Sequence, residues 1–219
     1  MHVFRGLPSP LQRRPSAVAI GNFDGVHLGH QALLEYVKEA AQARGLVPSV
    51  VTFEPHPKDF FGRGGEVARI STLYDKVNAI LGTGIERIYI LPFNSRLACM
   101  PAETFVRDVL LKGLDACWMS VSPTFYHKEA RVSSSRIREA LAVGDLYEAA
   151  LMLGRPYSMT GRVIHGAALG RTLGFPTLNM APIPPGSHSR PAVTGVFAVR
   201  IHGLGQAVQN GVASIGVKP

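Results

Sequence analysis

Residues 21–30, of sequence GNFDGVHLGH, constrain the fold of this chain more than any other feature. They follow the apolar run 17–20, which is typical of a buried strand, and they precede a segment whose apolar residues recur at helical spacing. We therefore expect a strand-to-helix corner. Its glycines allow backbone amides to approach a bound group closely, and the free N–H groups of the following helix point into the same space. The corner predicts a binding site for an anion.

His27 and His30 lie three residues apart at the start of this expected helix, so both rings can face the anion. An imidazole can donate hydrogen bonds to such a group and share developing negative charge. A glycine-rich turn with two surface histidines is the alternative. The pattern H-x-G-H between a strand and a helix favours the anion site.

Strands alternate with helices through the first 150 residues. The first helix is expected to run from about residue 30 to 44, with Gly45 as its C-terminal glycine. A second helix is expected to begin at Ser71 or Thr72, and a third at Pro101, with residues 105, 106, 109 and 110 as its apolar side. Strands are expected at 49–53, 87–91 and 116–121, and the prolines of 54–57 predict a stiff loop without regular structure. The fold class is α/β, with a Rossmann-like, doubly wound parallel sheet that binds ligands at the carboxyl ends of its strands.

The character of the chain changes near residue 154. All 15 acidic residues precede it, whereas residues 151–219 carry six basic residues and no Asp or Glu. Short β-rich runs separated by glycines predict part of a small β-barrel in this region. We therefore divide the chain into an α/β nucleotide-binding domain at 1–153 and an incomplete β-barrel domain at 154–219.

The net charge of +8 favours anionic ligands. The sequence has no long Lys/Arg cluster with interleaved aromatic residues, so small phosphorylated ligands are favoured over nucleic acid. No apolar run approaches a membrane span and no signal peptide is recognisable, which indicates a cytoplasmic protein. Cys99 and Cys117 have no metal-binding spacing and are expected to be buried thiols. No feature requires a protein partner.

Two further stretches could hold phosphate groups. Residues 133–138, SSSRIR, predict a serine-capped helix start whose hydroxyls, amides and Arg138 could grip a phosphate, although an ordinary cap with a solvated basic face is the alternative. Thr177 and Asn179 alternate to the same side of an extended backbone and could bind Mg²⁺ and orient a phosphate. A polar turn is the alternative there.

Five motifs, in this order along the chain, resemble those of the bacterial bifunctional riboflavin kinase/FAD synthetases. They are GNFDGVHLGH at 21–30, EPHP at 54–57, SSSRIR at 133–138, GRVIHG with GRTLGFPTLN between 161 and 179, and GVASIGVKP at 211–219. The resemblance covers nearly the whole chain. It implies an N-terminal domain that adenylates FMN and a C-terminal β-barrel that phosphorylates riboflavin, with ATP and Mg²⁺ required and FMN and FAD as substrate and product.

The resemblance also implies roles for individual residues. His27, His30 and Arg138 would be catalytic groups that contact the ATP phosphates, and Thr177 and Asn179 would hold the Mg²⁺ of the kinase domain. The other residues expected to bind nucleotide or flavin are Gly21, Asn22, Phe23, Asp24, Gly29, His56, Ser133, Ser134 and Gly170. Ser135 stands where the family usually has Thr, a change that keeps the hydroxyl.

Two departures from the family pattern bear on activity. After residue 121 about one β-α unit is missing before the serine motif, and part of the flavin and nucleotide site could be missing with it. The family's kinase uses a downstream Glu as general base, and residues 151–219 contain no carboxylate. We therefore expect the chain as given not to be a competent riboflavin kinase. A nucleotidylyltransferase for another phosphorylated acceptor, and a flavin- or nucleotide-binding fragment without turnover, are the alternative functions.

Overall fold

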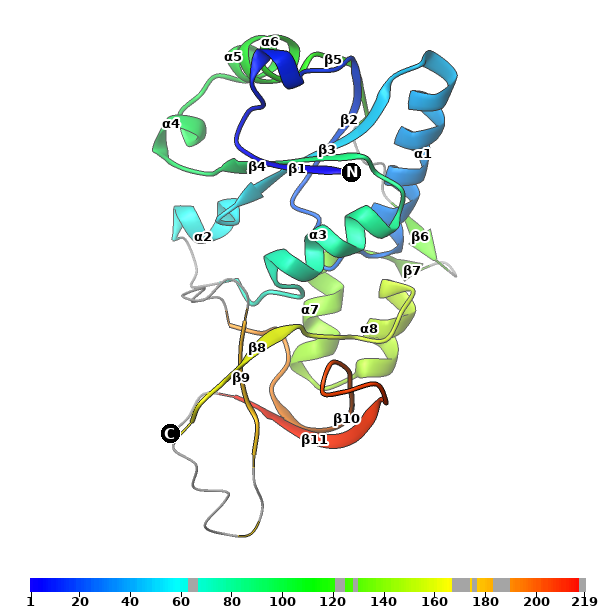
Figure 1. Cartoon of the computed structure of the whole chain (residues 1–219), viewed down its shortest axis with the longest axis vertical. Helices are drawn as coiled ribbons and strands as arrows, with labels where there is room; N and C mark the ends of the chain where they lie inside the picture. The colour runs from blue at the N-terminus through cyan, green and yellow to red at the C-terminus, as the bar shows by residue number, and fades with distance from the viewer. Residues whose placement is uncertain are drawn as a thin grey trace.

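The computed structural model describes residues 1–62, 67–120, 125–127, 130–166, 174, 177–182 and 190–216. Five parallel strands form the main sheet in the order β1-β4-β3-β2-β5, with helices on both of its faces (Figure 1). They are β1 (His2–Arg5), β2 (Ser16–Ile20), β3 (Val47–Glu54), β4 (Arg87–Pro92) and β5 (Ala116–Ser120). The predicted doubly wound parallel sheet is confirmed. The edge strand β1 was not predicted.

The helices include the three expected in the first 114 residues and a pair after the sheet. They are α1 (Leu28–Arg44), α2 (Pro57–Phe61), α3 (Leu73–Gly82), α4 (Ser95–Ala98), α5 (Ala102–Thr104), the π-helical segment η2 (Phe105–Leu111), α6 (Lys112–Leu114), α7 (Ser134–Ala142) and α8 (Leu146–Leu153), with a 3₁₀ turn η1 at Pro10–Gln12. Two predicted helix ends are confirmed. Gly45 is left-handed (φ 64°) at the end of α1, and the Thr72 hydroxyl accepts a hydrogen bond from the Asp75 N–H at the start of α3 (3.0 Å).

Two local predictions are wrong. The loop predicted at 54–57 is wrong at its ends: Glu54 is the last residue of β3 and Pro57 the first residue of α2, a position where the missing N–H costs nothing, while Pro55 and His56 do lack regular structure. Val106 is 40% exposed rather than part of the apolar side of its helix. The chain there turns into the π-helical segment η2, and the different turn size rotates Val106 away from the buried face that Val109 and Leu110 keep.

The core lies on both faces of the sheet because the central strands alternate their side chains between them. On β2, Ala17 and Ala19 pack against α1 and α3, and Val18 packs toward η2 and α6 on the other face. All three side chains have no exposed surface. The two covered faces make the carboxyl ends of the strands the edge where a ligand can be reached.

Beyond the sheet, α7 and α8 join the second part of the chain in one apolar cluster. The cluster combines Ile137 and Leu153 of these helices with Ala192 and Val193, and Phe197 packs against it. The other strands that the structure describes pair as antiparallel ribbons. They are β6 (Tyr126–His127) with β7 (Ala130–Arg131), β8 (Gly161–Ile164) with β9 (Asn179–Pro182), and β10 (Gly195–Ile201) with β11 (Gln209–Ile215), the last two pairs lying in the lower part of Figure 1. The expected β-rich texture after residue 154 is confirmed. The packing continues across the predicted boundary at 153/154.

The prediction of buried thiols is wrong, since Cys99 and Cys117 are both exposed and free. Cys117 lies on β5, an edge strand with alternate residues open to solvent, and Cys99 follows the short surface helix α4. Within the described ranges, no helix combines the length and apolar character needed to cross a bilayer.

Candidate functional site

The predicted strand-to-helix corner is confirmed at the carboxyl end of β2. The chain leaves β2 at Gly21, turns through residues 22–27, and enters α1 at Leu28 with His27 as the N-cap. Phe23 and Val26 both have positive φ angles (51° and 42°), which are uncommon for residues with a side chain and unfavourable for a β-branched one. Surrounding contacts must therefore hold this loop in shape.

Asp24 supplies many of those contacts from inside the loop. Its buried carboxylate accepts hydrogen bonds from the Ser71 N–H and hydroxyl, from the Ile70 N–H, and from Arg138 Nη2 at 2.7 Å. The Ser71 hydroxyl also accepts a hydrogen bond from the Gly25 N–H (3.0 Å). The carboxylate thus joins the loop to the segment before α3 and to α7.

The two histidines lie face to face at the start of α1. Their ring centroids are 3.6 Å apart with the planes 15° from parallel, and His27 Nδ1 accepts the His30 N–H as the helix cap (3.3 Å). Because Nδ1 of His27 is an acceptor, a neutral His27 ring carries its proton on Nε2. Gly29 lies where a larger residue would press against His27 and Phe125, at 3.3 and 3.0 Å from an added Cβ. A glycine at this position lets the histidine pair stack.

Burial keeps both rings neutral at pH 7. Desolvation lowers the pKa of His27 to about 4, against the opposing effect of the Asp24 charge. It also lowers the pKa of His30 well below its usual value, with further lowering from His27 and Lys76. A neutral imidazole has one N–H donor, so each ring can offer one hydrogen bond to a bound group.

Among the residues that the structure describes, two buried polar atoms at this corner have no hydrogen-bond partner. They are Nδ1 of His30 and Oδ1 of Asn22. Buried polar atoms in proteins are normally satisfied, because an unpaired one costs free energy of desolvation. Orphaned atoms beside the N-terminus of a 17-residue helix are the pattern expected where a ligand completes the hydrogen bonds.

A charged network forms the neighbouring part of the edge, at the end of β3. Arg69 Nη2 lies 2.8 Å from Asp59 and 3.4 Å from Glu54, and Lys76 Nζ lies 3.8 Å from the other oxygen of Glu54. His56, predicted as a ligand-binding residue, is 4% exposed and caps α2 by accepting the Lys58 N–H at Nδ1. Burial, with the Arg69 charge, lowers the pKa of His56 to about 4.

Lys76 was missed by the sequence analysis. It is 3% exposed, and its ammonium contacts the hydroxyl of Thr52 (3.3 Å), which itself donates to the Asn22 carbonyl (3.2 Å). Burial lowers the pKa of Lys76, and Glu54 opposes that effect. The lysine was hard to find because it lies on the helix face with Val77 and Ile80, where the pattern predicts only apolar packing.

The serine motif, residues 133–138, lies at the start of α7 and contacts the glycine loop of residues 21–27. Ser133 is the N-cap of α7 and accepts the Arg136 N–H (3.4 Å), as the ordinary-cap alternative expects. The Ser134 hydroxyl donates to the Asp24 carbonyl (3.1 Å), while Arg138 donates to Asp24 and to the Ala68 carbonyl (2.8 Å). The structure therefore brings Ser134 and Arg138 to the glycine loop, where they contact protein atoms.

Four phenylalanines gather beyond the charged network. Phe60 and Phe61 of α2 lie edge-on to Phe93, with ring centroids 5.5 and 5.7 Å away, and Phe53 lies 5.8 Å from Phe93. The side chains of Phe60 and Phe61 are 39% and 54% exposed. Exposed aromatic faces at the carboxyl ends of β3 and β4 are suited to stack on a planar ring system.

The predicted kinase residues lie far along the chain from this edge. Asn179 begins β9 opposite Ile164, and Thr177 is exposed two residues before it. Gly170 lies outside the described residues. The structure does not bring Thr177 or Asn179 into hydrogen-bond contact with the residues of the loop, within the ranges it describes.

Comparison with known proteins matches two successive regions of the chain to different families. A family model described as FAD synthetase matches residues 9–143, and one described as riboflavin kinase matches residues 153–219. A Streptococcus pneumoniae chain of solved structure, described as a macrolide-efflux protein, has a TM-score of 0.74 and 25% identity over 98% of this chain and 78% of its own.

Curated relatives carry the name bifunctional riboflavin kinase/FMN adenylyltransferase. The protein from Escherichia coli K12 is 34% identical over all of this chain and 79% of its own length, and that from Bacillus subtilis is 35% identical over 95% and 74%. The Escherichia coli alignment runs over 252 positions, more than the 219 residues of this chain, so the chain lacks residues that this relative has within the aligned region. The chain belongs to the bifunctional riboflavin kinase/FMN adenylyltransferase family.

Proposed function

We propose that this chain transfers the adenylyl group of ATP to FMN, giving FAD and pyrophosphate. The observation that carries the proposal is the orphaned, buried His30 Nδ1, which can donate a hydrogen bond to a phosphate oxygen, beside the stacked histidines at the start of α1. A phosphate oxygen of FMN attacks the α-phosphorus of ATP, and the bond from that phosphorus to the bridging oxygen of pyrophosphate breaks. The chemistry needs positioning and neutralisation of charge, and no covalent intermediate.

The corner suits this reaction because it offers hydrogen-bond donors to the phosphates without a fully charged cation. Neutral His27 carries an N–H at Nε2, and the first amides of α1 add the positive end of the helix dipole. A negative charge that grows on the departing pyrophosphate raises the proton affinity of the rings, so their hydrogen bonds strengthen in the transition state. The catalytic roles of His27 and His30 rest on this reasoning.

FMN is favoured as the acceptor by the exposed rings of Phe60 and Phe61. The isoalloxazine is a large planar ring system, and stacking on aromatic side chains is the usual way to bind one. The two rings lie three and four residues past Pro57, on the same edge as the histidine pair. An acceptor without a flat ring would not use them.

Mg²⁺ enters this proposal mainly through ATP. The described residues contain no group of three or more His, Cys, Asp or Glu side chains that could hold a metal ion. Mg²⁺ at nucleotide sites takes most of its ligands from phosphates and water and only one or two from the protein. In the second region, the hydroxyl of Thr177 and the amide oxygen of Asn179 could supply the one or two protein ligands of such an ion. A Mg²⁺ ion held by them would offset the charge of a phosphate group.

For the second region we propose that the chain as given does not phosphorylate riboflavin. The support is compositional, since residues 151–219 have no Asp or Glu to take the proton of the riboflavin hydroxyl. Incubation with riboflavin and Mg·ATP should produce no FMN. FMN formed at a rate comparable to the Escherichia coli relative would overturn this part of the proposal.

The adenylyl step is tested by incubating the full chain with FMN and Mg·ATP and following FAD and pyrophosphate by chromatography. Equal amounts of both products are expected. Pyrophosphate formed with nicotinamide mononucleotide but not with FMN would support a nucleotidylyltransferase for another acceptor. Calorimetric binding of ATP and FMN without any pyrophosphate would support a binding fragment instead.

A further inference from the structure

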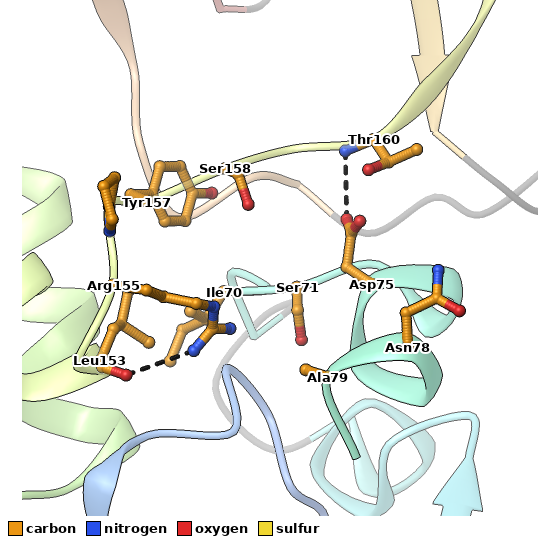
Figure 2. Close-up of a pocket in the computed structure, with 11 residues that line it drawn as sticks. Ile70, Ser71, Asp75, Asn78, Ala79, Leu153, Arg155, Tyr157, Ser158 and Thr160 are labelled. Atoms are coloured by element: carbon orange, nitrogen blue, oxygen red, sulfur yellow. Dashed lines mark hydrogen bonds between the residues drawn. The ribbon is translucent and has the colours of Figure 1, made fainter. Parts of the chain in front are cut away.

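Arg155 lies just after α8, in the region matched by the riboflavin kinase model, but its side chain reaches back to the glycine loop. Its Nη2 donates to the Gly25 carbonyl at 2.7 Å, and its Nη1 donates to the Val26 and Leu153 carbonyls at 3.3 Å each. Figure 2 shows the guanidinium beside Leu153. A residue of the second region is therefore built into the first region's candidate site.

Two of the three carbonyls that Arg155 binds, those of Gly25 and Val26, belong to the most strained part of the loop. Val26 is β-branched and has a φ of 42°, and its amide donates to the Phe23 carbonyl, whose own residue has a φ of 51°. Such conformations persist only where neighbouring contacts hold them. His27, the N-cap of α1 and half of the histidine stack, is the next residue, so the orientation of its ring depends on this strained turn.

The groups around the Arg155 guanidinium favour its hydrogen bonds to the loop carbonyls. Its guanidinium forms no ion pair with a carboxylate of the described residues, and burial lowers its pKa. The planar fork of N–H groups is instead satisfied by three carbonyls. Gln31 Nε2 binds two of the same carbonyls, those of Val26 and Leu153, at 2.9 Å each. Two side chains from different parts of the sequence thus converge on one turn.

The second region is joined to the candidate site by a further set of hydrogen bonds. The backbone of residues 190–192 exchanges hydrogen bonds with Arg69, whose N–H donates to the Arg190 carbonyl and whose carbonyl accepts from the Ala192 N–H. Arg69 is one of the two cations of the charged network at the end of β3, with Lys76. Beside Arg155 a cavity of about 270 Å³ opens between residues 153–160 and α3 (Figure 2). Small solutes can therefore reach the position of the guanidinium.

We propose that Arg155 is a positioning residue for adenylyl transfer, which holds the Gly25–Val26 turn so that His27 faces the nucleotide phosphates. This inference rests on the proposed function. Arg155 acts through the loop backbone and does not touch the substrate. The start of the second region is consequently part of the adenylyltransferase, whatever that region does itself.

The test compares Arg155→Ala with the matched control Arg162→Ala, which removes an exposed arginine from β8. For Arg155→Ala, kcat of FAD formation should fall about tenfold to a hundredfold, the range that misplacement of a catalytic group produces, while KM for FMN changes by less than about threefold. Arg162→Ala should match the unmodified chain. Low millimolar guanidinium, which can enter the cavity, should restore part of the lost kcat, and equal concentrations of Na⁺ should not.

The outcomes separate this inference from the proposed function. No FAD from the unmodified chain would refute the proposed function itself. FAD at a normal rate from Arg155→Ala, or a loss that guanidinium does not relieve, would refute the positioning role. Should Arg155→Ala not fold, Arg155→Lys decides, because an ammonium cannot serve the carbonyls as a planar fork does. An unchanged kcat in a folded Arg155→Lys would then overturn the inference.

Discussion

Arg138 and Asp24, which lie 114 residues apart in the sequence, form a largely buried ion pair of 2.7 Å under the glycine loop. The Nε of Arg138 donates to the Ala68 carbonyl at the same time. In the structure this arginine therefore braces the loop, and its contact with the triphosphate stays a prediction from the family resemblance. A guanidinium carries five N–H donors, and these two contacts use Nε and Nη2, so Nη1 could contact a phosphate without breaking the pair.

The ion pair makes a prediction for stability. Arg138→Ala should lower the free energy of unfolding by about 3 kcal/mol, because it leaves the Asp24 carboxylate buried without its counter-charge. Adding Asp24→Asn should recover part of that loss, since the amide carries no charge. Arg136→Ala on the same helix is the control. Its pair with Glu148 is about 40% exposed and should contribute less than about 1 kcal/mol. Urea unfolding of the unmodified chain, Arg138→Ala, Asp24→Asn and the double variant measures the coupling, with Arg136→Ala as the fifth protein, and additive losses in the double variant would contradict the prediction.

His30 makes a prediction for catalysis. His30→Ala should lower kcat of FAD formation by about tenfold or more, the usual cost of losing a donor to developing charge. His2→Ala, which removes an exposed histidine from the edge strand β1, should have no effect. The measurement is the steady-state rate of pyrophosphate release. A rate for His30→Ala equal to that of His2→Ala would remove His30 from the catalytic residues.

The aromatic cluster makes a prediction for the acceptor. Phe61→Ala should raise KM for FMN by about tenfold, because stacking on an aromatic ring contributes about 1–3 kcal/mol in comparable sites. KM for ATP should not change, since the ATP phosphates are expected at the start of α1. Tyr147→Ala is the control, as it removes an aromatic ring that is 76% exposed on α8. Equal increases in both KM values would indicate a general disturbance of the fold.

His56 makes a prediction for pH. Its pKa of about 4 in the folded chain lies below the ordinary value of 6.5, so the unfolded chain binds a proton that the folded chain does not between these values. Stability should therefore be complete above pH 6.5 and fall as the pH drops toward 4, by on the order of 3 kcal/mol from this residue. His56→Asn keeps an N-cap acceptor for Lys58 but cannot titrate.

Urea unfolding at pH 7.5 and pH 4.5 tests this. The His56→Asn variant should lose less stability than the unmodified chain over that interval. The remaining loss should come largely from His27 and His30, because burial lowers the pKa of both rings as well. Identical losses in the two proteins would show that His56 does not carry the pH dependence assigned to it.

Much of the architecture could be predicted from local patterns. The alternation of strands and helices, the Gly45 and Thr72 helix ends and the corner at residues 21–30 depend on residues a few positions apart. Hydrophobic period, helix caps and glycine turns act over that range, so the sequence displays them directly. The ordered motifs likewise predicted the family that the comparisons show.

The tertiary structure alone decided which side chains complete the site. The partners of Asp24 lie 46 to 114 residues away, those of Arg155 reach 130 residues back, and the burial of Lys76 depends on Glu54 and Thr52 across the sheet edge. Exposure of Cys117 follows from β5 being an edge strand, which requires the strand order. These properties come from burial and from charges brought together by the fold, and neither has a local signature in the sequence.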